Sequence, residues 1–260
     1  MSNQNHSDFH MIQMMLDPRR LMELGRMLHL PLKQVGNNYL VHCALSELFQ
    51  DQAPKPFHIE DTHRQISEYS RNNRQSIIVL TYSELDWQSL QNIARGFASP
   101  TVYQIIDWDR IASKPMPTQF PEGLKLRFEL RTCPVIRKAS DGERWKKGQE
   151  VDVFLSKVWE TNDSGIDIDR EDIYKEWLIN KFKSQPSVDL ESLHIKRFSI
   201  ERMSRRNHQP KRKLRIIKRP DVTFTGTMTI KNGNEFKELL FKGIGRHKSF
   251  GFGMLKIRRA

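Results

Sequence analysis

Four glycines fall within eleven residues near the C-terminus of this 260-residue chain, between a helix-like stretch and a strand-like one. The glycines are Gly243, Gly245, Gly251 and Gly253. The basic side chains between them are Arg246, His247 and Lys248. Glycine adopts positive φ without steric cost, and successive backbone N–H groups together with basic side chains attract anions. The segment therefore predicts a phosphate-binding loop between the last helix and the last strand.

Two common nucleotide-binding motifs do not fit this loop. A Walker A loop needs Gly-Lys-Ser/Thr, but His247 stands where that glycine belongs. A dinucleotide fingerprint needs a third glycine at position 248, which is lysine, and it opens a helix early in a βαβ unit. We therefore expect the phosphates of a polymer rather than of a nucleotide.

The net charge of +12 is concentrated in two segments. Residues 196–219 hold eleven Lys and Arg against one acid, Glu201, and residues 242–260 hold six and no acid. Such local basic stretches are typical of a nucleic-acid interface. A solvated or disordered tail is the alternative, but Leu214, Ile216 and Ile217 favour an ordered strand within the first stretch.

Other compositional features narrow the class of protein. The two cysteines, Cys43 and Cys133, lack metal-ligand spacing, which predicts a reducing compartment, no disulfide framework and no cysteine-based zinc site. The nine histidines form no HxxxH pair on a recognisable helix, and no apolar run approaches the roughly 18 residues of a membrane span. The N-terminus lacks the order of a signal peptide. We expect a cytoplasmic protein that needs neither metal nor cofactor.

The first part of the chain, residues 1–110, has the element order of a ferredoxin-like domain. The expected strands are 9–16, 57–60, 76–82 and 101–107. The expected helices are 18–27, 37–49 and 86–98. Asp17 followed by Pro18 suits a helix start, as do Asn37 and Asn38.

A linker is predicted at residues 111–123, which hold three prolines and Gly123. A second series of elements fills residues 124–260. Its expected strands are 124–131, 192–200, 213–217, 222–230 and 253–257. Its expected helices are 150–160, 169–183 and 232–241. The predicted fold class is therefore α+β, with two tandem ferredoxin-like (RRM-like) domains.

Three stretches resemble one protein family, in the same order along the chain. They are residues 39–57 with Tyr39-Leu40-Val41-His42, residues 124–134, and residues 224–255 with the glycine-rich loop. The chain resembles the CRISPR repeat-processing endoribonucleases of the RAMP superfamily, in particular the CasE subgroup of type I-E (Cascade) surveillance complexes. Related type I and type IV systems remain alternatives.

Helix geometry bears on the candidate catalytic histidine independently of that resemblance. At 100° per residue, an apolar face forms, and Tyr39, His42, Cys43 and Ser46 fall on the other side. The apolar face consists of Val41, Ala44, Leu45, Leu48 and Phe49. Tyr39 and His42 are three residues apart and therefore neighbours. A helix histidine alone is usually structural or simply exposed, whereas the resemblance implies that His42 is catalytic.

The resemblance implies metal-independent RNA cleavage. The ribose 2′-hydroxyl attacks the phosphorus, which leaves a 5′-hydroxyl and a 2′,3′-cyclic phosphate or 3′-phosphate. His42 would act as acid or base, and Tyr39 would position it or bind the phosphate or ribose, unless its ring only packs. Ser46 is a weaker candidate. Arg246 and Lys248 of the loop would hold the phosphate, with His247 as a secondary contact whose imidazole leaves some redistribution of the catalytic roles open. Phe250 and Phe252 are expected in the core rather than as base-stacking platforms.

The stretch from Arg205 to Arg215 predicts a basic β-hairpin, which in the resembled family grips the stem of the repeat hairpin. The RNA-binding candidates are Arg205, Arg206, Lys211, Arg212, Lys213, Arg215, Lys218 and Arg219. The resemblance implies cleavage at the 3′ base of the stem and assembly with other Cascade subunits, and the extensive basic surface predicts retention of the crRNA. A non-catalytic RNA-binding subunit and a basic DNA-binding module are the alternatives.

Overall fold

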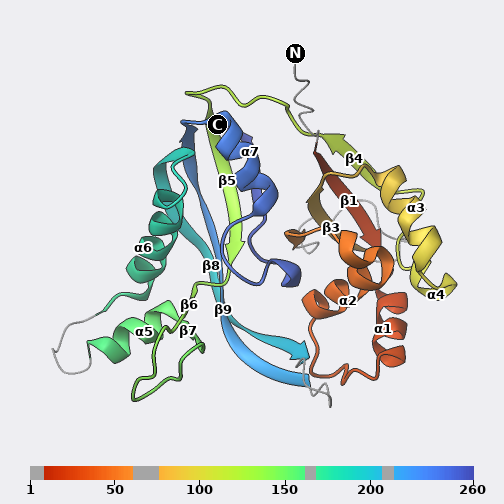
Figure 1. Cartoon of the computed structure of the whole chain (residues 1–260), viewed down its shortest axis with the longest axis horizontal. Helices are drawn as coiled ribbons and strands as arrows, with labels where there is room; N and C mark the ends of the chain where they lie inside the picture. Colours follow the sequence, from red (N-terminus) through yellow and green to blue (C-terminus); the bar gives the residue numbers. More distant parts are fainter. Residues whose placement is uncertain (1–8, 61–75, 162–167, 207–213) are drawn as a thin grey trace, which may run out of the picture. The chain divides into compact units, whose positions relative to one another are not determined.

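The computed structural model describes residues 9–60, 76–161, 168–206 and 214–260 (Figure 1). The chain forms two compact units. The first comprises the chain up to Thr118 together with Arg202–Ile217 and Lys248–Met254. The second comprises Gln119–Glu201, Lys218–His247 and Leu255–Ala260. Each unit thus draws on segments that lie far apart in the sequence.

The first unit contains a four-stranded antiparallel sheet with the strand order β2-β3-β1-β4. The strands are β1 (His10–Leu16), β2 (Phe57–Ile59), β3 (Ile77–Ser83) and β4 (Ala112–Pro115). The helices are α1 (Pro18–Met27), α2 (Asn37–Phe49), the 3₁₀ turn η1 (Gln50–Gln52), α3 (Trp87–Phe97) and α4 (Pro100–Tyr103). This order is the predicted ferredoxin-like βαββαβ arrangement.

Capping residues determine where these helices begin, and alternating apolar residues determine which face of a strand is buried. Asp17 accepts a hydrogen bond from the Arg19 backbone N–H at the start of α1, and Asp86 accepts one from Ser89 at the start of α3. On β1, Ile12 and Leu16 are fully buried at alternate positions, and they belong to one core cluster with the apolar face of α2. The predicted helices at 18–27, 37–49 and 86–98 are confirmed within one residue.

The predicted last strand of this unit, residues 101–107, is wrong. Ser99 accepts a hydrogen bond from the Val102 backbone N–H, and Pro100 occupies the first turn, so the chain begins helix α4 there instead. The fourth strand is β4, inside the region predicted as a linker, where it pairs with β1. Pro115 is tolerated because it ends a strand at the sheet edge.

The second unit contains a four-stranded sheet with the order β10-β5-β9-β8. Its strands are β5 (Lys125–Thr132), β8 (Val188–Arg206), β9 (Leu214–Ile230) and β10 (Leu255–Arg259). A separate hairpin is formed by β6 (Val135–Arg137) and β7 (Glu150–Asp152). The helices are α5 (Val153–Glu160), α6 (Arg170–Lys183) and α7 (Gly233–Lys242). The β5-α6-β8-β9-α7-β10 order confirms the second ferredoxin-like arrangement.

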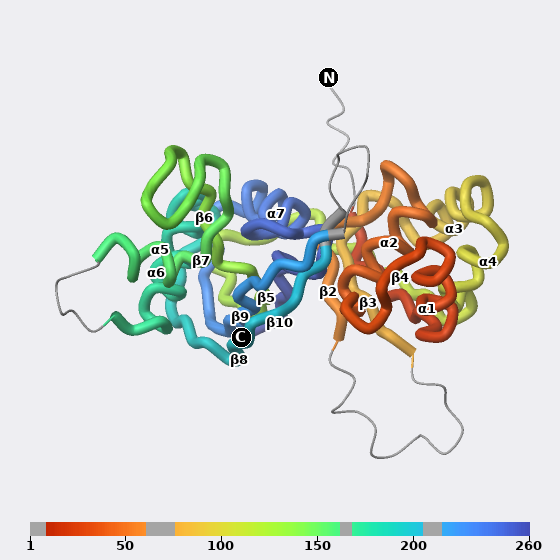
Figure 2. The backbone as a smooth tube through the Cα atoms, turned by 90° about the horizontal axis from the view of Figure 1, so that it is seen from below, coloured from red at the N-terminus to blue at the C-terminus, as the bar shows by residue number. Residues whose placement is uncertain are grey.

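Along β5, side chains alternate between an apolar face and a charged face of this sheet. Leu126, Phe128 and Leu130 are buried, and the Phe128 ring lies 5.9 Å from that of Phe182 in α6. Arg127 and Glu129, at the intervening positions, point to the other face. Figures 1 and 2 show α6 and α7 beside this sheet. The helices therefore cover the apolar face and leave a charged one.

Strands β8 and β9 are longer than predicted. The expected strands 213–217 and 222–230 form one continuous strand, β9. Pro220 lies within this strand and does not end it. β8 and β9 are neighbours in the sheet, as the predicted hairpin requires, and residues 207–213 between them lie outside the described residues. The expected helix at 150–160 begins with the short strand β7.

Replacing Gly226 with alanine is expected to destabilise the second unit. A Cβ at this position of β9 would lie 2.1 Å from the backbone oxygen of Ser192 and 2.8 Å from the Phe128 ring. Relieving such overpacking costs about 1–3 kcal/mol, which urea unfolding will show as a lower midpoint. Gly96→Ala is the matched control, since nothing lies within 4 Å of its Cβ and alanine favours the α3 helix by about 0.5–1 kcal/mol. Equal midpoints for the two variants would contradict this packing.

Candidate active site

Helix α2 of the first unit carries both candidate catalytic side chains. Its apolar residues, from Val41 to Phe49, are buried as the helical spacing predicts. Tyr39 and His42 lie on another side of the helix, and their ring centroids are 5.9 Å apart. The i, i+3 spacing thus brings the two rings together as expected.

Tyr39 is more buried than helix geometry alone suggested. Only 6% of this residue is exposed, because the segment after α1 covers that side of α2 with Leu30 and Val35. Tyr39 and Leu40 form a second apolar cluster with these residues. The alternating apolar residues at positions 28, 30 and 32 are the sequence signal that could have revealed this cover.

The glycine-rich segment supplies a third ring to this site. Its 3₁₀ turn η3 (Lys248–Phe250) lies against α2 and β2. The Phe250 ring lies 4.6 Å from the His42 imidazole and is stacked 6.1 Å from the Tyr39 ring, with an interplanar angle of 6°. Phe252, in contrast, is buried core, as predicted. The contact between Phe250 and the two candidate residues was not foreseen from the sequence.

The glycines give this segment the backbone that it needs. Gly243, Gly245, Gly251 and Gly253 all have positive φ, between 67° and 85°. A Cβ at Gly251 would lie 2.9 Å from Asn38 Oδ1 and 3.2 Å from the Phe57 ring. Gly251 therefore allows the close approach to the start of α2 that places Phe250 on His42.

Burial and charge both act on the His42 imidazole. Burial lowers the pKa of His42 below its ordinary value of 6.5, and the positive charge of Lys55 lowers it further. The imidazole is therefore mostly neutral at pH 7. A neutral imidazole can accept a proton, which suits it to the role of general base.

In the second unit, Glu150 at the start of β7 contacts three basic side chains. It accepts a hydrogen bond from Arg246 Nε at 2.7 Å and pairs with His247 Nε2 at 2.9 Å. Arg219 lies 3.8 Å away. The hydrogen bond from His247 lowers the pKa of Glu150 to about 2, against the opposing effect of burial and with help from Arg246. This carboxylate was not among the predicted site residues, although all three of its basic partners were.

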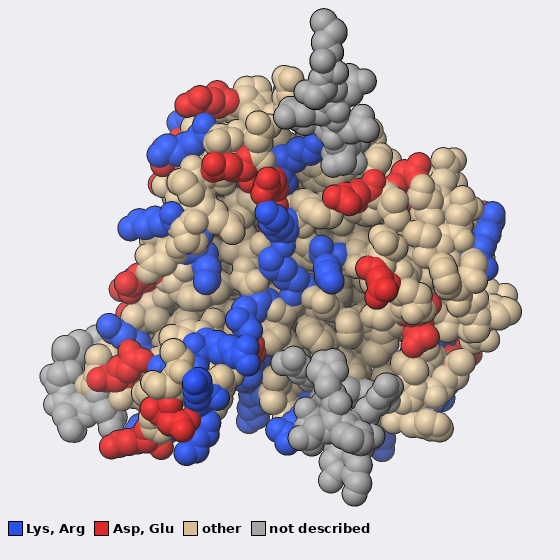
Figure 3. Space-filling model, in the orientation of Figure 1, with Lys and Arg blue, Asp and Glu red and all other residues tan. Residues whose placement is uncertain are grey.

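The remaining predicted side chains are distributed along β8, β9 and α2. Arg205 and Arg206 end β8, and Arg215 and Lys218 are exposed on β9. Ser46 is half-buried on α2. Lys211, Arg212 and Lys213 lie outside the described residues. In the space-filling view, Lys and Arg side chains gather over the C-terminal end of α7 and around β7 and β9 (Figure 3).

Comparisons with known proteins place the chain in a family. The model of a family described as CRISPR associated protein matches residues 9–259. The chain belongs to this family. No curated protein matches it at a significant level. Within the described part of the chain, no helix is both long and apolar enough for a membrane span.

Solved structures share the fold of this family member at low sequence identity. A CRISPR endoribonuclease Cse3 bound to 19 nt RNA is 16% identical, with a TM-score of 0.60 over 96% of this chain and 99% of that one. The CRISPR-associated protein Cas6e from Escherichia coli str. K-12 is 18% identical, with a TM-score of 0.54 and coverages of 96% and 100%. A chain of a CRISPR RNA-guided surveillance complex, pre-nicking, is 17% identical, with a TM-score of 0.55 and the same coverages.

Replacing Phe250 with alanine is expected to raise the pKa of His42 toward its ordinary value. Burial is the main cause of the lowered pKa, and this substitution removes the ring 4.6 Å from the imidazole. An NMR titration of labelled histidine, assigned with a His42→Gln variant, measures the change. Phe97→Ala is the control, because Phe97 is 70% exposed at the end of α3. An unchanged His42 titration in Phe250→Ala would mean that this ring does not desolvate the imidazole.

Proposed function

We propose that this protein is a metal-independent endoribonuclease that binds the stem-loop of a CRISPR repeat and cleaves pre-crRNA at the 3′ base of the stem. The observation that carries the proposal is the His42 imidazole, kept neutral by burial beside Tyr39 and held under a turn of the glycine-rich segment. Family membership and the fold shared with an RNA-bound CRISPR endoribonuclease support it.

In the proposed reaction, neutral His42 accepts the proton of the ribose 2′-hydroxyl. The 2′-oxygen then bonds to phosphorus while the bond from phosphorus to the 5′-oxygen breaks. The 5′-oxygen takes a proton from Tyr39 or from solvent and leaves as a hydroxyl. The upstream product carries a 2′,3′-cyclic phosphate, or a 3′-phosphate once water opens the ring. Proton transfer of this kind contributes about 10²–10⁴-fold to the rate.

Basic side chains of the glycine-rich segment would bind phosphates of the RNA. Lys248 belongs to the turn that lies against α2. Arg246 is fixed through its Nε by Glu150, and its side chain remains 44% exposed, so the outer edge of the guanidinium can face a phosphate. Glu150 thereby orders this arginine before RNA binds, which reduces the entropic cost of binding.

The basic strands β8 and β9 would grip the RNA stem. A-form RNA hides its base edges in a deep, narrow groove, so contacts to phosphates should dominate. Such an extensive basic surface favours retention of the cleaved crRNA. We further propose that the protein stays with this RNA in a cytoplasmic effector complex with other CRISPR subunits, consistent with its fold match to a chain of a surveillance complex.

A His42→Ala variant is expected to lose about 10²–10⁴-fold in the single-turnover rate of repeat cleavage, while its affinity for the stem-loop is kept. His29→Asn is the matched control, because asparagine tolerates the positive φ of 52° at that position. Wild-type cleavage should persist in EDTA and stop when a deoxynucleotide replaces the ribose at the cleavage position.

The outcomes separate this proposal from the alternative functions. Wild-type protein that binds the stem-loop tightly but never cuts it would instead be a structural RNA-binding subunit. Cleavage that needs divalent metal and ignores the missing 2′-hydroxyl would indicate a different nuclease class.

The pH dependence of cleavage tests the proposed role of His42 as base. The rate should fall as the pH drops through the lowered pKa of His42, since protonation removes the base. Lys55→Met raises that pKa, because the positive charge of Lys55 helps to lower it. The fall then begins at higher pH, so this variant should be slower than wild type on the acidic side of the profile and unchanged at pH 8. A rate that increases as the pH drops would assign His42 the role of acid.

A further inference from the structure

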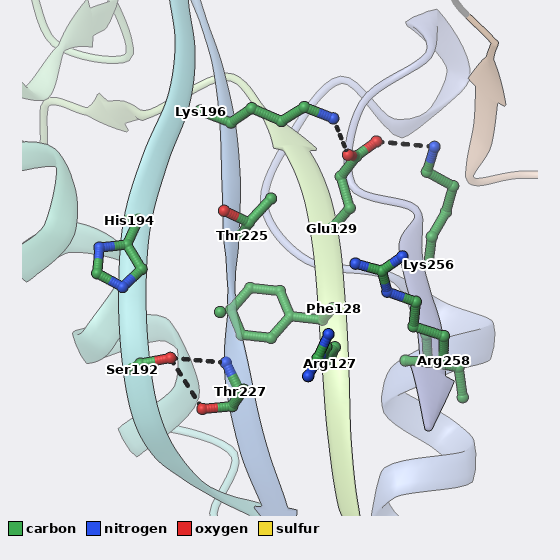
Figure 4. A pocket seen from close by; sticks show the side chains of 12 residues that line it. Arg127, Phe128, Glu129, Ser192, His194, Lys196, Thr225, Thr227, Lys256 and Arg258 are labelled. Carbon is green, nitrogen blue, oxygen red and sulfur yellow. Dashed lines mark hydrogen bonds and ion pairs between the residues drawn. The ribbon is translucent and has the colours of Figure 1, made fainter. Parts of the chain in front are cut away.

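The charged face of the second unit's sheet forms an open trough of about 560 Å³ (Figure 4). Strands β5, β8, β9 and β10 all contribute to it, and it lies on the face that the helices do not cover. Its volume is within the range of about 300–1,000 Å³ that is usual for ligand sites. None of its basic side chains was among the predicted RNA-binding residues.

Two arginines stand directly opposite each other in this trough. Arg258 of β10 pairs in register with Arg127 of β5. Like charges at opposed positions of an antiparallel pair destabilise a sheet. Both arginines are exposed, and neither forms an ion pair or side-chain hydrogen bond with any residue in the described ranges. An anion held between the two guanidinium groups would relieve their repulsion.

The next position along the same strands is arranged differently. Lys256 lies opposite Glu129 and binds it at 2.8 Å, and Lys196 of β8 binds the same carboxylate. Burial opposes ionisation of Glu129, but the two lysines outweigh it and lower its pKa to about 2. The lysines are thus partly neutralised by the protein itself, whereas the arginine pair is not.

Hydroxyl groups complete the surroundings of the arginine pair. Thr227 of β9 lies in register with Arg127, and its hydroxyl is 2.8 Å from that of Ser192 on β8. Thr225 occupies the corresponding position beside Glu129. Guanidinium groups and hydroxyls together are the usual partners of phosphate oxygens in nucleic-acid complexes.

Among its lining residues the trough has no exposed phenylalanine, tyrosine or tryptophan ring, and His194 of β8 contributes an exposed imidazole. Phe128 is only 4% exposed, and its ring packs toward Phe182 on the helical side of the sheet. Proteins that hold single strands by stacking use exposed aromatic platforms. Recognition here would therefore act on the sugar-phosphate backbone and depend little on base sequence.

We propose that this trough is a second RNA site, in which Arg127 and Arg258 clamp a backbone phosphate of single-stranded RNA that flanks the stem-loop. The inference rests on the proposed repeat-RNA substrate and adds a contact outside the stem. An acidic segment of a partner protein would satisfy the same charges, but the two hydroxyls beside the arginines favour a phosphodiester.

The test compares two repeat RNAs, the stem-loop alone and the stem-loop with eight-nucleotide uridine flanks on both ends. Binding of full-length protein is measured across a salt series with non-cleavable, 2′-deoxy substrates. Wild type should bind the flanked RNA more tightly. An Arg127→Gln/Arg258→Gln variant should lose that gain, and its salt slope for the flanked RNA should fall by about 0.7–1.4, for one or two phosphates. Its affinity for the stem-loop alone should match wild type.

Arg144→Gln/Lys183→Gln is the matched control, since it removes the same charge from exposed positions outside the trough. The proposal would be overturned if the flanks increased the RNA affinity of the trough variant as much as that of wild type. So would a soluble poly-glutamate that competes for the flank site better than uridine oligonucleotide, because it would identify an acidic protein segment as the occupant. Failure of the proposed function looks different, since wild type would then not bind the stem-loop specifically.

Discussion

The contact between the Phe250 ring and the His42 imidazole is the interaction on which the proposed chemistry depends. An exposed histidine on a helix would be partly protonated near neutral pH, and it would share its surroundings with water. Burial beside Phe250 and the charge of nearby Lys55 lower the pKa of His42 instead, which favours the neutral imidazole. The contact joins residues 208 positions apart in the sequence, so the site in the first unit depends on a segment from near the C-terminus.

The glycines of that segment serve packing as much as they serve ligand binding. All four have positive φ, and Gly251 lies where any Cβ would collide with Asn38 or Phe57. A side chain at this position would move the turn away from α2 and uncover the imidazole. The usual reading of such a segment, as a cradle of N–H groups for phosphate, is therefore incomplete, because the same backbone also seats the ring that tunes His42.

Local signals in the sequence predicted most of the fold, and long-range contacts account for what they missed. Asp17-Pro18 and Asp86 placed α1 and α3 correctly because a cap acts within one turn. Ser99-Pro100 carries the same signal, but the apolar residues after it favour a strand by their pattern. The family resemblance singled out Tyr39 and His42, and their i, i+3 spacing predicted only that the two rings are neighbours. The burial of Tyr39 and the contact with Phe250 depend on residues outside α2, which helix periodicity does not reveal.

The acidic residues of the second unit divide its basic side chains into two groups. Some are paired with a carboxylate of the protein, and others remain available to a ligand. Glu150 holds Arg246 and His247, and Glu129 holds Lys196 and Lys256. Each carboxylate is ionised over the whole working pH range, so each orders its basic partners permanently. Arg127 and Arg258 stand beside the second of these acids without sharing it. Since a sheet gains nothing from opposing two guanidinium groups, their pairing is best explained by an anion that the folded protein has yet to bind.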